Sequence, residues 1–175
     1  MAAAGASQAQ TVTIIPYGAT WRYLDDGSDQ GTAWRAPAFA DAAWASGPGQ
    51  LGYGDLDEAT VTGFIDTDPI ATGVQKNATT YFRTTVNVPD PTQFISAKLT
   101  LLYDDSGAVF INGTQVARTA NLAANAAFNT FATSASADNA TQTWILPPSV
   151  FVAGVNTVAV EIHQESAARD RKSVV

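Results

Sequence analysis

The sequence has no cysteine and only one histidine in 175 residues. Without cysteine the chain can form no disulfide, offers no thiolate nucleophile and has no sulfur ligand for zinc. Apolar runs are short, and none approaches the roughly 20 residues that a helix needs to cross a bilayer. Charged residues make up 14% of the chain, and the net charge is −7. Because that charge would repel a phosphate backbone, we expect no nucleic-acid partner.

The familiar catalytic motifs are missing as well. There is no nucleophile elbow G-x-S-x-G, and GPGQLGYG lacks the Lys-Ser/Thr pair of a phosphate loop. Many acidic residues are sequence neighbours, which point to opposite faces of a strand, whereas glycoside hydrolysis needs two carboxylates facing each other. We therefore predict a protein that is not an enzyme. A small hydrolase with an unfamiliar site is the alternative.

What the sequence does contain is a series of strand-like segments. Apolar residues, 46% of the total, are sufficient for the core of one domain. Short runs rich in β-branched and aromatic residues are separated by Gly, Pro, Asn or Asp, which is an all-β pattern. The runs are 11–18, 80–88, 97–103, 108–111, 114–118, 142–147 and 156–164. Asn112-Gly113 predicts a tight hairpin with a type I′ turn, and 121–128 is expected to be a helical turn within a loop.

Alternation within these runs predicts which side chains enter the core. Successive residues of a strand point to opposite faces, so every second apolar residue should lie on the buried face. The residues predicted to point inward are Phe82, Thr84, Val86, Val88, Leu99, Leu101, Val109, Ile111, Val158, Val160 and Ile162.

The same parity places Arg83, Glu161 and His163 together on the opposite, polar face of one sheet. Arg83 and Glu161 could pair there, either as a structural ion pair or as a ligand-binding pair. His163 could transfer a proton, or it could be a structural histidine that is bonded to a neighbouring carboxylate or carbonyl. We treat all three as candidate ligand-binding residues.

Several motifs in series resemble a known family. They are WRYLDDGSDQGTAWRAPAFADAAWASGPGQLGYGD, TTYFRTTVNV, LTLLYDDSGAVFINGTQVAR and GVNTVAVEIHQ, which together span Thr20 to Gln164. This series resembles the galactose-binding-domain-like β-sandwich that accompanies secreted bacterial phosphoesterases and glycoside hydrolases as an accessory module. The resemblance implies a jelly-roll-like β-sandwich of two antiparallel sheets. It also implies secretion or a periplasmic location.

For function, the resemblance implies a non-catalytic accessory domain of a larger exported enzyme, with a glycan or the parent catalytic domain as partner. We predict that this domain binds carbohydrate, and the alternative is a docking module without a free ligand. Aromatic rings can stack on sugars, so Tyr53 and Phe64 in the long loop region 47–80 are candidate ligand-binding residues, with core packing as the other interpretation. We predict that Trp21 and Trp34 lie in the core.

Loop carboxylates provide a candidate metal site. Asp beside Gly, Thr and backbone carbonyls is suitable for a hard cation, and the resembling sandwiches often hold a structural calcium. Asp25 and Asp26 are the first candidate ligands, and Asp41 is a supporting one. The alternative for each is an Asp that caps a turn.

The two ends of the chain differ from the sandwich pattern. We predict a disordered remnant at 1–10, a sandwich over 11–168, and a non-native or disordered tail at 169–175. Family members continue into one more strand, whereas 170–175 can be written as GAT CGG AAG AGC GTC GTG before a stop, which resembles a sequencing-adapter read. A genuine polar end is the alternative. If the last strand is missing, the open sheet edge should recruit a second copy as a homodimer, the segment TVTII, or the tail itself.

Overall fold

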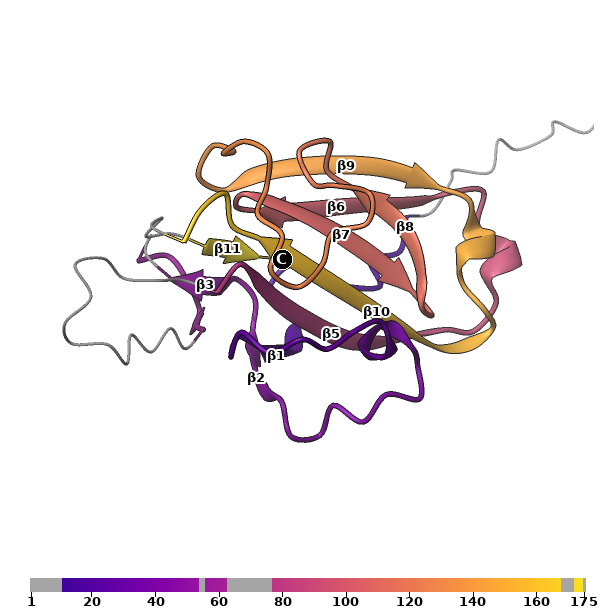
Figure 1. The fold of residues 1–175 in the computed structure, drawn as a ribbon. Helices are drawn as coiled ribbons and strands as arrows, with labels where there is room; N and C mark the ends of the chain where they lie inside the picture. The colour runs from indigo at the N-terminus through magenta and orange to yellow at the C-terminus, as the bar shows by residue number, and fades with distance from the viewer. Residues whose placement is uncertain (1–10, 54–55, 63–76, 168–171, 175) are drawn as a thin grey trace, which may run out of the picture.

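Two β-sheets packed face to face form this protein in a computed structural model that describes residues 11–53, 56–62, 77–167 and 172–174 (Figure 1). The strands are β1 (Thr20–Leu24), β2 (Ala45–Pro48), β3 (Leu51–Tyr53), β4 (Thr60–Val61), β5 (Thr79–Val88), β6 (Ala97–Tyr103), β7 (Ser106–Ile111), β8 (Thr114–Arg118), β9 (Ala140–Leu146), β10 (Gly154–His163) and β11 (Lys172–Val174). Three short 3-10 turns accompany them, η1 (Ala33–Arg35), η2 (Pro91–Gln93) and η3 (Pro148–Val150). The all-β prediction is therefore confirmed.

The larger sheet has six strands in the order β2-β1-β5-β10-β7-β8, and the smaller has five in the order β4-β3-β11-β6-β9. Pairing is antiparallel throughout, except that β3 and β4 run parallel. The long strands β5 and β10 lie at the middle of the larger sheet and pair along ten residues (Figure 1). This central pair positions the side chains of both faces.

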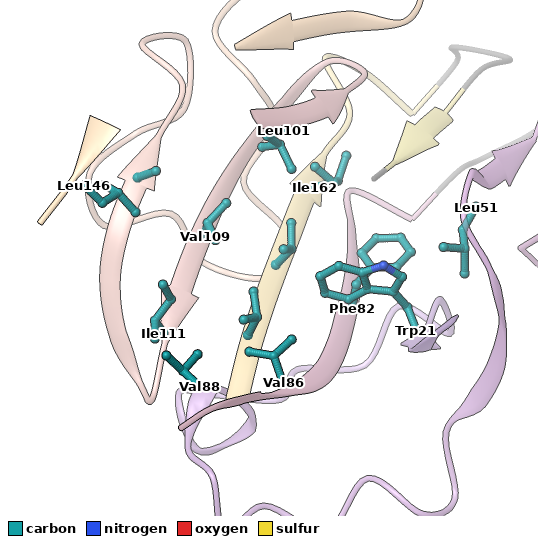
Figure 2. Packing of buried hydrophobic residues seen from close by; sticks show 13 residues of the cluster. Trp21, Leu51, Phe82, Val86, Val88, Leu101, Val109, Ile111, Leu146 and Ile162 are labelled. Atoms are coloured by element: carbon teal, nitrogen blue, oxygen red, sulfur yellow. The ribbon is translucent and has the colours of Figure 1, made fainter. Parts of the chain in front are cut away.

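The core between the sheets follows the predicted alternation (Figure 2). Nine of the eleven predicted inward residues are buried, and the other two, Thr84 and Leu99, are half-buried. Trp21 lies in the same core cluster, as predicted. The predicted inward-facing side of these strands is therefore confirmed.

The β7–β8 hairpin has the predicted turn. Asn112 and Gly113 have φ angles of 50° and 88°, and a type I′ turn requires positive φ at both central positions. The 121–128 segment forms turns within the loop after β8 rather than a regular helix.

The opposite face of the larger sheet differs from the prediction, because it is also buried. Arg83, Glu161 and His163 have exposed fractions of 2%, 5% and 0%. They lie beneath the segment around η1 and the loop that follows β8. A second apolar cluster fills this layer, and it comprises Trp34, Trp44, Tyr81, Ala108, Phe110, Leu122 and Ala159. The larger sheet is thus covered on both sides where these residues lie.

Residues 11–18 contain no strand, contrary to prediction, and Val12 and Ile14 are exposed. At the other end, Lys172–Val174 pairs with β3 and meets β6 at the Val174–Tyr103 position. Of the arrangements expected at an open edge, this is the one in which the tail itself pairs. The nature and origin of the tail and the homodimer all stay predictions. Across the residues placed here, no helix is long and apolar enough to span a membrane.

Candidate functional site

A pocket of about 240 Å³ lies on the outer face of the larger sheet. Strand β10 contributes Glu161, and the edge strand β8 contributes Gln115 and Arg118. The segment at η1 and the loop after β8 supply the remaining walls. The full lining is Thr32, Arg35, Gln115, Arg118, Ala123, Ala124, Asn125, Ala126 and Glu161.

Arg35 is held in the pocket wall by an aromatic ring and a carboxylate. Its guanidinium carbon lies 4.1 Å from the centroid of the Phe110 ring, which is a cation–π distance. Its Nη2 donates to Oε2 of Glu161 at 3.3 Å. Because the Glu161 side chain is only 7% exposed, the pair is mostly shielded from water. Arg35 therefore compensates the buried charge of Glu161.

Arg118 closes the other side of the pocket. Its Nη1 donates to the backbone carbonyls of Thr119 and Leu122, so one side chain binds the start of the loop after β8. Leu122 is buried in the second apolar cluster and anchors the same loop. Within the described part of the chain, no carboxylate lies within salt-bridge distance of Arg118.

The side chains that line the pocket therefore carry a net positive charge, although the protein as a whole is acidic. Two guanidinium groups and one carboxylate line it, whereas the whole chain has a net charge of −7. Glu161 and Arg35 neutralise each other, which leaves the charge of Arg118 without an acidic partner at the pocket wall. Hydroxyl and amide groups of Thr32, Gln115 and Asn125 add hydrogen-bonding capacity around these charges.

Arg83 does not pair with Glu161, which corrects the prediction. In the β5–β10 register Arg83 lies opposite Ala159, and Glu161 lies opposite Tyr81. Nε of Arg83 donates to Oδ2 of Asp41 at 2.7 Å, and its Nη1 donates to the carbonyl of Trp34. Arg83 therefore fixes the segment around η1 to the sheet, and it is not among the residues that line the pocket.

His163 is fully buried next to Glu161. Its Nδ1 lies 2.7 Å from the carbonyl oxygen of Thr130 and 2.9 Å from the Thr79 hydroxyl. Its Nε2 lies 3.9 Å from Oε1 of Glu161. This is the geometry of a histidine bonded to a neighbouring carbonyl, and the ring is not among the groups that line the pocket.

Tyr53, one of the two loop aromatics, does not join this site. Tyr53 is buried in β3 of the smaller sheet, so it offers no exposed platform for a sugar. Burial, followed by the charges of Asp25, Asp104 and Asp105, raises the pKa of its hydroxyl well above the usual range. Phe64 lies outside the described residues.

The candidate calcium ligands have protein partners instead. Oδ1 of Asp25 accepts from the Thr80 hydroxyl at 2.7 Å, and Oδ1 of Asp26 accepts from the backbone N–H of Ser28 at 2.9 Å. Asp41 bridges Arg83 and the more exposed Arg22.

Where the chain is described, no group of three or more acidic or histidine side chains is arranged to hold a metal ion. Structural calcium therefore stays a prediction.

Sequence reasoning included Glu161 among the candidates but missed Arg35, Arg118, Gln115 and Asn125. Only nine lysines and arginines occur in the chain, so each arginine could have been considered as a candidate site residue. The arginines follow no periodic pattern, however, and only the fold brings these four residues together around Glu161.

Tyr81, which belongs to the second apolar cluster, gives a pH prediction. Burial, and next the charge of Glu161, raises the pKa of its hydroxyl to about 12. Between about pH 10, the usual tyrosine value, and pH 12 the folded protein holds a proton that the unfolded chain releases, so stability should fall as pH rises.

We expect the Tyr81→Phe variant to lose less stability across this alkaline window than the parent protein. Urea unfolding at pH 8, 10 and 11 measures this difference. Equal losses in both proteins would contradict it.

No model of a protein family matches this sequence, and no curated protein matches it either. Solved structures do share its fold. A β-glycosidase from Bacteroides vulgatus aligns over 94% of this chain with a TM-score of 0.53 and 13% identity. A β-glucuronidase from glycoside hydrolase family 2 aligns over 88% with a TM-score of 0.52 and 15% identity.

A third structure, Bifidobacterium dentium β-glucuronidase complexed with coumarin-3-O-glucuronide, aligns over 90% of this chain with a TM-score of 0.51 and 12% identity. The chain spans only 15% to 21% of the length of these three proteins. The likeness therefore establishes a β-sandwich fold that occurs as one part of much longer glycoside hydrolases.

Proposed function

We propose that this protein is a non-catalytic, carbohydrate-binding accessory module of a larger exported enzyme, and that the pocket of Arg35, Arg118 and Glu161 is its binding site. The observation that carries the proposal is the pocket itself. It combines charged and amide side chains with a volume of about 240 Å³, room for about eight water molecules, which suits one sugar ring rather than a long chain segment.

Two further observations support this function. The matching structures contain this fold as a small part of long glycosidases, which is consistent with an accessory module. In addition, two carboxylates of this layer are engaged in ion pairs, since Asp41 is paired with two arginines and Glu161 with one. A buried, paired carboxylate suits the binding of hydroxyl groups better than proton transfer.

Binding to a panel of polysaccharides tests the proposal. We expect retention of the protein by at least one immobilised glycan, competition by its soluble fragment, and no turnover on ester, phosphate and glycoside substrates. Failure to bind any glycan would favour a docking module that packs on a catalytic domain. Turnover would favour the small hydrolase.

A further inference from the structure

We infer that the pocket selects a sugar unit that carries a carboxylate, such as a uronic acid, rather than a neutral sugar. This inference rests on the proposed function, because it specifies the ligand class of the same site. Its basis is the distribution of charge around the pocket and the state of each charged group in the folded protein.

The positive charge available to a ligand comes from Arg118. Its Nη1 is committed to the carbonyls of Thr119 and Leu122, and these bonds fix the guanidinium in one orientation. Backbone carbonyls are neutral, so they orient the group without cancelling its charge. No carboxylate among the described residues compensates it. A planar, pre-oriented guanidinium is the side chain best suited to a carboxylate.

The wall that contains Glu161 repels an anion. A bound acidic sugar must therefore lie with its carboxylate away from this wall. Glu161 is buried and paired with Arg35 at 3.3 Å, and its carboxylate accepts hydrogen bonds but repels a second carboxylate. A uronic acid satisfies both walls, because its hydroxyl groups can donate toward Glu161 while its carboxylate lies toward Arg118. A neutral sugar would leave the charge of Arg118 without a counter-charge.

The net charge of the whole protein opposes the binding of an acidic glycan. With a net charge of −7, the protein repels anions at long range, and salt screens that repulsion beyond about 10 Å. Recognition of an acidic glycan therefore depends on a local cation inside the pocket. One substitution at the pocket rim that changes the local charge should therefore alter the affinity for an acidic glycan.

Gln115 provides that substitution. It lies on β8, lines the pocket and is exposed, so a change of charge there should leave the fold intact. The probe is trigalacturonate, compared with its methyl ester, which has the same backbone without the charge. Titration calorimetry on the full chain measures the dissociation constants of both ligands.

We expect the free acid to bind at least about tenfold more tightly than the ester. Gln115→Glu should weaken binding of the acid by about tenfold, and Gln115→Lys should strengthen it, because a charge at the rim acts at close range. The control is Thr141→Glu, which adds the same charge at an exposed position on β9 of the other sheet.

Other results would overturn the inference. Equal binding of acid and ester, or equal effects of Gln115→Glu and Thr141→Glu, would show that the pocket does not select a carboxylate, while the proposed function would still hold. Equally tight binding of a sulfated trisaccharide would show recognition of anions in general. Absence of binding to these probes and to every glycan of the polysaccharide panel would overturn the proposed function itself.

Discussion

Replacement of Arg83 by methionine should destabilise the protein by about 3 kcal/mol, because it breaks a buried ion pair on one side only. Arg83 is 2% exposed and bonds Oδ2 of Asp41 at 2.7 Å. It also donates to the carbonyl of Trp34. The variant would leave that carbonyl and part of the Asp41 charge without their donors. Urea unfolding measures the loss as a lower midpoint with an unchanged slope.

Arg22→Met is the control, since Arg22 forms an ion pair with the other oxygen of the same Asp41 at 3.4 Å but its side chain is 42% exposed. An exposed ion pair contributes less than about 1 kcal/mol, so the control should lose far less stability than Arg83→Met. Similar losses in the two variants would contradict the role of burial in this pair.

Trp34→Ala should have the largest effect of all, with a loss of about 4 kcal/mol, because it removes a fully buried indole. The Trp34 ring lies 4.8 Å from the ring of Tyr81 and 5.6 Å from that of Phe110. Phe110 in turn supports the guanidinium of Arg35 in the pocket wall. The same variant should therefore weaken glycan binding as well as unfold at lower urea.

Trp144→Ala is the control for this prediction. Trp144 is half-buried and packs against the core between the sheets, away from the pocket. We expect a loss of about 1 to 2 kcal/mol and unchanged glycan binding. If Trp34→Ala lost no more stability than Trp144→Ala, or left binding unchanged, the outer layer would not support the pocket.

Local patterns were sufficient for the strands β5 to β10 and for the core between the sheets, but not for β1 to β4. The alternation in β10 predicted that Val158, Val160 and Ile162 point between the sheets, and they are buried there. Asn112-Gly113 predicted the β7–β8 turn because few other residue pairs tolerate positive φ at both positions. Both signals act within a few residues, so they can be read without the fold.

The interpretation of the opposite face failed because it treated polar residues as markers of solvent. Arg83, Glu161 and His163 alternate with apolar neighbours, which is typical of a sheet with one wet face. In the structure each is covered by chain that is distant in sequence. Arg83 meets Asp41, Glu161 meets Arg35, and His163 meets the carbonyl of Thr130. Paired in this way, polar side chains can be buried without a large penalty.

The sequence by itself determined the all-β class, the alternation of side chains in the strands β5 to β10 and the residues of the inner core, because side-chain alternation and turn chemistry are properties of neighbouring residues. Only the tertiary structure decided the pocket, since Arg35 precedes Glu161 by 126 positions and nothing in either segment specifies the other as its partner. Such contacts depend on how two loops pack over a sheet, and packing of that kind is chosen by the whole chain rather than by any local run of it.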